Sequence, residues 1–201
     1  LADKLYFLCE LSWEMLSTDQ MSLNYRLFPD RIRKLFGAMV QEEKDLDHWH
    51  YYMMGQTMLI RNADGDYTPA HRSLLEFFVA YKFAAELGAL APDFLELAQM
   101  QKNVDLSLPP QEYQWSEYFG QRDGRIAPLQ EFARESLEVL RSGLGQAPLT
   151  KAVIDLLMSI LIPYRSSVKY PLIEIICSTQ GKPREEVGYV GGNAATLAIM
   201  L

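Results

Sequence analysis

The stretch YTPAHRSLLEFFVAYKFAAEL, residues 67–87, decides how this chain is interpreted, because a long apolar segment directly follows two side chains that can hold an anion, His71 and Arg72. Apolar residues recur through the segment at helical spacing, which predicts a helix with a broad buried face. The aromatic-rich part of that face comprises Leu74, Leu75, Phe77, Phe78, Tyr81 and Phe83. We interpret this stripe as core.

The start of this helix has two possible registers. Ser73 and Glu76 match a capping box, in which Glu76 would accept a hydrogen bond from the Ser73 backbone N–H. Thr68 and Pro69 form a competing pair of N-cap and first helical residue. On the first register, His71 lies just outside the helix, beside unpaired N–H groups and the positive end of the helix dipole. Such a position suits a phosphate.

The residues before this helix predict further short elements. Apolar spacing predicts a helix over Lys4–Leu16, and Pro29 suits the first residue of a short basic helix over 29–37. A third helix is expected over Leu46–Gly55, and a β-hairpin over 57–68 with its turn at Asp64 and Gly65. Three short helices, a hairpin and a longer helix follow one another in a winged-helix unit.

The second half of the chain predicts a helical arm. Residues 101–127 are polar and rich in turn residues, so we expect a loop-rich connection that WSEYF, residues 115–119, pins onto a core. Helical periodicity then returns over Leu129–Leu140, over Leu149–Ile162 before a stop at Pro163, and over Tyr170–Thr179. The predicted fold class is therefore mainly α, with a short hairpin wing followed by an all-α arm.

The composition agrees with a globular protein. The chain has 201 residues, a formal net charge of −7, 49% hydrophobic residues and 22% charged residues. Charged or polar residues interrupt every apolar run, so we expect no membrane helix and a cytoplasmic location. Cys9 and Cys177 are expected to be reduced, buried thiols. Because the first residue is Leu1, we expect a piece of a longer chain.

Three segments together resemble one known family. Residues 67–87 resemble the pattern Y-x-F-x-H-x-S-F-x-E-Y-F-x-A that closes the winged-helix domain of NACHT-type STAND NTPases, which are signalling ATPases. LADKLYFLCELSWEML at 1–16 and DLDHWHYYMMGQTMLIRNADGDY at 45–67 are similar to the helices and hairpin before that motif. YVGGNAATLAIML at 189–201 looks like the junction after which members enter repeat arrays.

The resemblance implies a role for His71. In that family the matching histidine donates to the β-phosphate of bound ADP and latches a closed, inactive state. Arg72 is a second candidate contact with the nucleotide, although with Ser73 and Glu76 it also fits capping and contact with the neighbouring nucleotide domain. The family usually has an aromatic residue at the position of Pro69, so we expect the second hairpin strand to be an edge or to be cut short.

The nucleotide-hydrolysing motifs are not found in this sequence. No G-x-x-x-x-G-K-[ST] is present, and GQRDGR at 120–125 lacks the required spacing and lysine. No apolar run ends in paired carboxylates. We therefore expect no catalytic residues and no enzyme activity in this segment, and binding of ADP or ATP only together with an upstream ATPase domain.

The resulting expectation is a nucleotide-sensing lid over residues 1–91, a helical arm over 92–187 and a junction over 188–201. Its expected partners are an upstream NACHT ATPase domain of the same chain, a C-terminal sensor or repeat region, and other copies on activation. Signal transduction, including defence signalling, follows from the resemblance alone.

The other motifs either predict no site or support an alternative function. Two histidines, His48 and His50, lack a third ligand at a credible spacing, and residues 62–66 lack the first carboxylate of a calcium loop, so no metal site is expected. The basic residues Arg26, Arg31, Arg33 and Lys34 leave a nucleic-acid-binding winged helix open. The net charge of −7 and the acidic hairpin tip argue against it. A helical interaction scaffold without a ligand is the third hypothesis.

Overall fold

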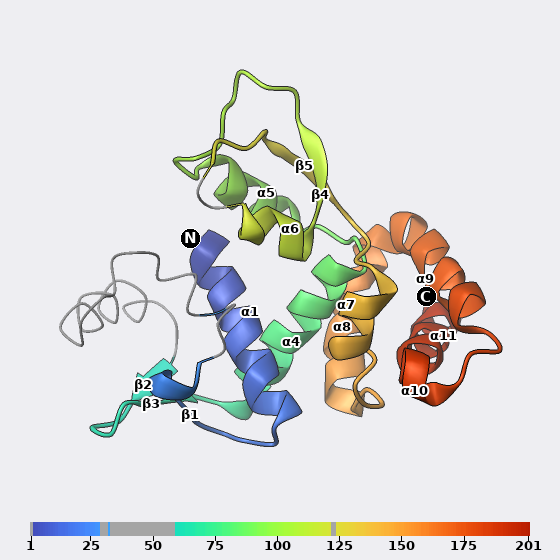
Figure 1. The fold of residues 1–201 in the computed structure, drawn as a ribbon, viewed down its shortest axis with the longest axis horizontal. Coiled ribbons are helices and arrows are strands. Elements are labelled where there is room, and N and C mark those ends of the chain that lie inside the picture. Colours follow the sequence, from blue (N-terminus) through green and yellow to red (C-terminus); the bar gives the residue numbers. More distant parts are fainter. Residues whose placement is uncertain (1, 29–31, 33–58, 122–123) are drawn as a thin grey trace. The chain divides into compact units, whose positions relative to one another are not determined.

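Figure 1 shows the computed structural model, which describes residues 2–28, 32, 59–121 and 124–201. The described part is mainly α-helical with two small sheets, which confirms the predicted mainly α class with a small β wing. The chain forms two compact units, one of Asp3–Val79 and one of Ala80–Leu201 with the first two residues. The division falls inside helix α4 (Arg72–Glu86). Our domain boundaries at residues 91 and 187 remain predictions.

The first unit contains α1 (Ala2–Ser17), which confirms the helix predicted over Lys4–Leu16. A 3-10 turn, η1 (Tyr25–Leu27), follows, and the helices predicted over 29–37 and 46–55 lie outside the described residues. Three nearly fully buried aromatic rings pack in a row in this unit. The Phe28 ring centroid lies 6.0 Å from that of Phe7 and 5.4 Å from that of Tyr67. The helix and the sheet therefore share one aromatic core.

The predicted hairpin is confirmed and gains a third strand. Strands β2 (Leu59–Arg61) and β3 (Asp66–Pro69) are antiparallel, and β1 (Leu23–Asn24) pairs with the other side of β3. The strand order is β1-β3-β2. Gly65 has φ of 86°, the left-handed value that the predicted turn requires.

The predicted long helix is α4, and its C-terminal end has the hydrogen bonds of a Schellman motif. The Ala89 N–H donates to the Ala84 carbonyl, and the Gly88 N–H donates to that of Ala85, at 2.9 and 3.0 Å. Gly88 has φ of 88°, and a Cβ there would lie 3.0 Å from the Phe132 carbonyl oxygen. Both the backbone conformation and the close approach therefore require glycine.

The second unit continues with α5 (Pro92–Gln99), β4 (Gln111–Gln114), α6 (Trp115–Gly120) and β5 (Leu129–Ala133). The WSEYF prediction is confirmed, because α6 places Trp115 in a buried cluster with Phe94, Phe119 and Phe132. Its ring centroid lies 4.9 to 5.6 Å from those three. This cluster is the core to which the polar connection is attached.

The helix predicted over Leu129–Leu140 is wrong up to residue 136, because residues 129–133 form β5 and the helix begins only at Leu137. β5 pairs in parallel with β4, and α6 lies on the connection that a parallel pair requires. The register shifts so that Gln111 faces Leu129 while Glu112 faces Glu131. Gln130 is the extra residue of this bulge, so the buried side chains of β5 are three residues apart, which imitates a helical period. The arm is therefore helical with one parallel sheet, not all-α.

The remaining helices are α7 (Leu137–Ser142), α8 (Lys151–Leu161), α9 (Arg165–Thr179), α10 (Arg184–Val187) and α11 (Val190–Met200). The stop at Pro163 is confirmed for α8, and Pro163 lies in the 3-10 turn η3 (Ile162–Tyr164). The helix predicted from Tyr170 begins earlier, at Arg165, and includes Pro171. The residues predicted as a junction thus contain a helix, α11, which packs mainly on α9.

Candidate functional site

The candidate site lies where β3 leads into α4, and Pro69 is the last residue of β3. Because β3 is the central strand, the expectation that it is an edge is wrong, whereas its early end is confirmed. β1 pairs only with Asp66 and Tyr67, so it requires no N–H from residue 69. A proline is therefore accepted at the end of a central strand.

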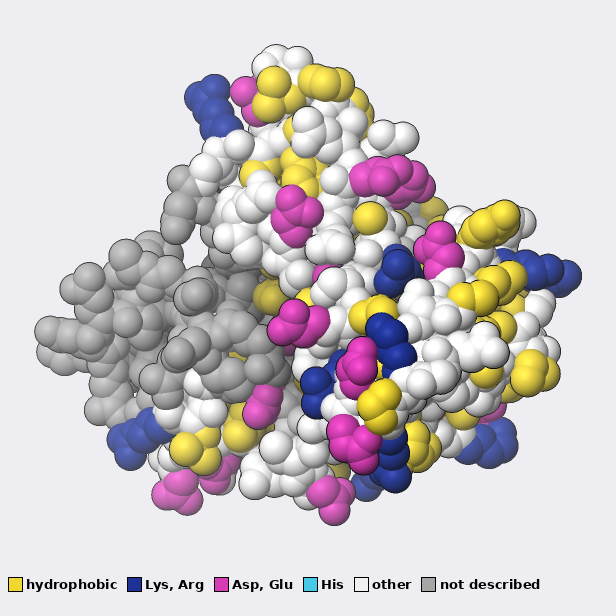
Figure 2. All heavy atoms as spheres, turned by 45° about the vertical axis from the view of Figure 1, so that its right-hand side comes forward, with side chains coloured by type: hydrophobic (Ala, Val, Ile, Leu, Met, Phe, Trp, Pro, Cys, Tyr) yellow, Lys and Arg dark blue, Asp and Glu magenta, His cyan; other side chains and the backbone are white. Residues whose placement is uncertain are grey.

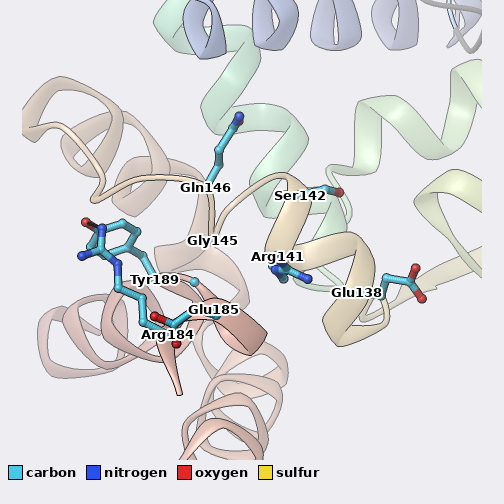
Figure 3. Close-up of a pocket in the computed structure, with 9 residues that line it drawn as sticks. Glu138, Arg141, Ser142, Gly145, Gln146, Arg184, Glu185 and Tyr189 are labelled. Carbon is cyan, nitrogen blue, oxygen red and sulfur yellow. Dashed lines mark hydrogen bonds between the residues drawn. The ribbon is translucent and has the colours of Figure 1, made fainter. Parts of the chain in front are cut away.

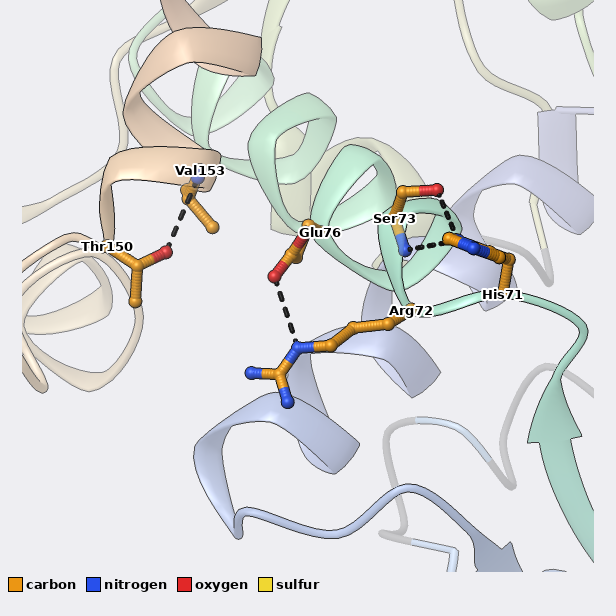
Figure 4. A network of polar contacts seen from close by, with 6 residues as sticks. All are labelled: His71, Arg72, Ser73, Glu76, Thr150 and Val153. Atoms are coloured by element: carbon orange, nitrogen blue, oxygen red, sulfur yellow. Dashed lines mark hydrogen bonds and ion pairs between the residues drawn. The ribbon is translucent and has the colours of Figure 1, made fainter.

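His71 begins the helix with its own ring. The Ser73 backbone N–H donates to His71 Nδ1 at 3.2 Å, and Ser73 Oγ lies 2.7 Å from the same nitrogen (Figure 4). Since Nδ1 accepts a hydrogen bond, the neutral ring carries its hydrogen on Nε2. The capping box predicted for Ser73 is wrong, because α4 already includes Ser73 and the ring of His71 occupies the N–H that Glu76 was expected to bind.

Glu76 instead pairs with Arg72. Arg72 Nε lies 3.2 Å from Glu76 Oε1, and the Arg72 side chain is 57% exposed (Figure 4). The pair is one helical turn long and uses only Nε of the guanidinium. Arg72 therefore keeps its outer nitrogens available while its stem is held against α4.

The two predicted residues, His71 and Arg72, thus lie side by side, exposed, at the start of a 15-residue helix. Within the described part of the chain, His71 Nε2 and the two Nη atoms of Arg72 have no hydrogen-bond partner. The first turn of α4 contains no acidic residue, so the positive end of its dipole is not neutralised there. Each side chain therefore presents donors of its own at the start of α4, with the Arg72 guanidinium turned toward Glu76 and the His71 ring turned toward Ser73 (Figure 4).

The hairpin beside this site is fixed by side-chain amides. Asn62 Oδ1 accepts hydrogen bonds from the N–H groups of Asp64 and Asp66, and the Asp66 carboxylate accepts from the amides of Asn24 and Asn62. The bond from Asn24, followed by that from Asn62, lowers the pKa of Asp66 below its usual 3.8. The turn interpretation of 62–66 is confirmed. The described residues contain no acidic, cysteine or histidine cluster that could hold a metal, and His48 and His50 lie outside them.

A cavity of about 690 Å³ lies elsewhere, within the second unit (Figure 3). It is lined by α7, the loop after α7, α10 and the residues between α10 and α11. The Arg184 guanidinium stacks 4.3 Å from the centroid of the Tyr189 ring and also hydrogen-bonds its hydroxyl. Arg141 and Glu185 line the same cavity, so both signs of charge face it.

A smaller cavity of about 270 Å³ shares Glu138 and Arg141 with the first. Neither cavity includes His71 or Arg72. Sequence reasoning missed both cavities because their lining comes from four helices and the loops between them, and no local spacing relates Arg141 to Arg184. The charges balance, so the lining selects no ligand class on its own.

The glycine-rich junction has a packing role. Asn193 is buried, donates to the carbonyls of Leu144 and Ala147 at 2.6 and 2.9 Å, and accepts from the Leu149 N–H at 3.2 Å. A Cβ at Gly191 would overlap Thr179 of α9. Asn193 therefore fixes the loop before α8, and Gly191 allows α9 and α11 to approach closely.

Most of the basic residues considered for nucleic-acid binding lie outside the described residues. Arg31, Arg33 and Lys34 lie outside the described residues, whereas Arg26 is exposed in η1. On the face shown in Figure 2, dark blue basic and magenta acidic side chains are interspersed rather than gathered. The described side chains on this face therefore form no basic stripe of the kind that duplex DNA requires.

Comparison with known proteins gives one informative relative. An uncharacterized WD repeat-containing protein of Nostoc sp. (strain PCC 7120) is 67% identical over an alignment of 207 residues, which covers 100% of this chain and 13% of the relative. This chain is therefore similar to one segment of a much longer protein. No known family model and no solved structure matches it. No helix among the described residues is both long and apolar enough to cross a membrane.

Proposed function

We propose that this chain is the nucleotide-state-sensing lid and helical connector of a NACHT-type signalling NTPase. The observation that carries the proposal is the start of α4, where the ring of His71 is oriented by Ser73 and lies beside the partly engaged Arg72. His71 Nε2 would donate to a phosphate oxygen of ADP held by an upstream ATPase domain, with Arg72 as a second contact. The similarity to a segment of a long protein supports a role within a larger polypeptide.

The size of the effect is sufficient for a latch. A hydrogen bond to a charged group contributes about 1.5–3 kcal/mol. If the contact exists in only one of two states, it changes their ratio by roughly 10- to 150-fold. Release of ADP and binding of ATP would then free α4 and permit self-assembly. Because no hydrolytic motif is present in the sequence, we assign hydrolysis to the upstream domain.

The test is the nucleotide that co-purifies with the full-length polypeptide carrying this chain. We expect tightly held ADP in the wild type and its loss in His71→Ala. Arg125→Ala is the matched control, since this exposed basic residue lies outside the start of α4. ADP retained equally by His71→Ala would overturn the latch.

The two alternatives predict other results of the same experiment. A nucleic-acid-binding winged helix predicts no bound ADP in any variant and salt-dependent retention of duplex DNA. A helical scaffold predicts neither. Either result would assign the exposed donors of α4 to another partner.

A further inference from the structure

The larger cavity, of about 690 Å³, lies wholly within the second unit, where α7 and α10 form two of its walls (Figure 3). Its volume lies within the roughly 300–1,000 Å³ that is usual for small-molecule sites. It includes neither His71 nor Arg72. A ligand in this cavity would therefore act on the helical arm and not on the proposed nucleotide latch.

Backbone contacts hold these two walls at a fixed separation. The Tyr189 N–H donates to the Gly145 carbonyl at 2.8 Å. A Cβ at Gly188, whose φ is 58°, would overlap the same carbonyl, and a Cβ at Gly145 would overlap the side chain of Val190. The loop after α7 and the turn after α10 thus touch through glycine backbone. The opening between α7 and α10 is therefore set by the fold of the chain.

The four described charged side chains that line the cavity differ in what they already contact. Arg184 is engaged, because its guanidinium stacks on the Tyr189 ring and hydrogen-bonds its hydroxyl. The Glu138 carboxylate is turned away from the other labelled side chains (Figure 3). The side chains of Arg141 and Glu185 form no hydrogen bond or ion pair with the described residues. The cavity thus offers one open cation on α7 and one open carboxylate on α10.

Two open charges of opposite sign on two walls suit a ligand that carries both signs. The Arg141 guanidinium can donate two parallel hydrogen bonds to a carboxylate, and the Glu185 carboxylate can accept from an ammonium group. A simple anion on Arg141 would be repelled by Glu185, and a simple cation on Glu185 would be repelled by Arg141. A zwitterion satisfies both groups, and it breaks no ion pair between them when it binds.

We propose that this cavity binds a small zwitterion of the amino-acid class, a free amino acid or a short peptide, with its carboxylate on Arg141 and its ammonium group on Glu185. Such a ligand joins α7 to α10, two short helices that no ion pair links within the described part of the chain. The proposal goes beyond the nucleotide latch and does not depend on His71. Loss of ADP from the polypeptide would leave this site intact.

The first experiment measures hydrogen exchange of the α10 amides in the full-length polypeptide during a titration with triglycine, which has two charged ends and no side chains. Exchange should slow about tenfold when the triglycine concentration reaches about ten times its Kd, because the ligand binds only the closed form. Glycine is titrated in parallel. Slowing by both identifies a free amino acid as the ligand, and slowing by triglycine alone identifies a short peptide. Unchanged exchange with both probes would overturn the proposal.

Two substitutions test the charged contacts. Arg141→Gln and Glu185→Gln should each weaken triglycine binding by about tenfold or more. Glu186→Gln is the matched control, because this neighbouring carboxylate pairs with Lys182 and lines only the smaller cavity. The three substituted side chains are exposed, so the variants should fold. An equal loss of binding in all three variants would refute the assigned contacts.

Probes with one blocked end separate a contact from a structural role. Glu185→Gln should weaken the binding of triglycine but not of acetyl-triglycine, which has no ammonium group. Arg141→Gln should weaken the binding of triglycine but not of triglycinamide, which has no carboxylate. A structural role would instead weaken the binding of every probe, and that result would overturn the proposal. Inorganic phosphate that slows exchange equally in the wild type and in Glu185→Gln would also overturn it, because the site would then bind a simple anion.

Discussion

At the scale of single residues, His71 has two tasks that one substitution can separate. Its Nδ1 accepts the Ser73 N–H, which is one of the unpaired donors at the start of α4, while Nε2 is the donor proposed for the phosphate. Asparagine is a favoured N-cap residue whose side-chain oxygen can accept the same N–H, but it has no ring to reach outward.

We expect His71→Ala to lower the free energy of unfolding by about 1 kcal/mol, the usual cost of losing an N-cap. His71→Asn should remain near the wild type, because the cap is retained. Urea denaturation checks this order. Both variants should lose ADP from the full-length polypeptide, so a folded His71→Asn protein that retains ADP would contradict the phosphate contact.

The residues at the start of α4 could be predicted, but their partners could not. The sequence placed His71, Arg72, Ser73 and Glu76 at a helix start, and the structure brings them together there. The sequence did not reveal that the ring of His71 caps the helix. With this cap α4 begins two residues earlier than the Ser73 register predicted, and Glu76 pairs with Arg72.

At the scale of elements, the parallel β4–β5 pair contains a pH-dependent contact. Glu112 and Glu131 face each other across the two strands. The hydrogen bond with Glu112, then burial and the repulsion between the charges, raises the pKa of Glu131 above its usual 4.5. A carboxyl whose pKa is raised in the folded state stabilises the fold below the unfolded pKa, and this stabilisation is lost as the pH rises through the folded pKa.

Glu131→Gln should therefore raise the urea midpoint of unfolding at neutral pH, because in the wild type Glu131 faces the carboxylate of Glu112. The difference from the wild type should shrink below pH 4.5, where Glu131 is protonated. Urea midpoints across this range measure the effect. A stabilisation that is the same at every pH would show that the contact between the two carboxyl groups is not its source.

The same pair explains where element prediction failed. Local spacing identified α1, α4, α8 and the hairpin, because their patterns repeat within a few residues. The β4–β5 register depends on pairing across the chain and on a bulge at Gln130, which disguises the alternation of β5. Pairing between residues that are distant in the sequence produces no local hydrophobic periodicity from which a strand could be predicted.

At the scale of the whole molecule, the C-terminal end of α4 is anchored in the second unit by buried charges. Lys82 Nζ lies 2.7 Å from Glu86 Oε1, with side chains only 8% and 2% exposed. The Glu86 carbonyl accepts the Glu135 N–H at 2.8 Å, and the fully buried Glu135 accepts the Ser116 N–H at 2.7 Å. These bonds join α4 to the segments around α6 and α7.

Lys82→Met should destabilise the chain by about 3–5 kcal/mol, because it leaves a buried carboxylate without its cation. Lys151→Met is the matched control: Lys151 forms the same one-turn pair with Asp155, but it is 86% exposed, and its loss should change little. Thermal or urea denaturation compares the two. Equal effects would mean that burial does not strengthen the Lys82 pair.

The continuous helix α4 also determines where this protein can be truncated. The two units divide between Val79 and Ala80, inside the helix. Cutting there would leave helical stubs of eight residues (72 to 79) and seven residues (80 to 86). Isolated helices shorter than about 12–15 residues are marginal in water. A truncated protein that preserves the first unit must therefore extend through Gly88, and a protease should find no ready cleavage point between the units.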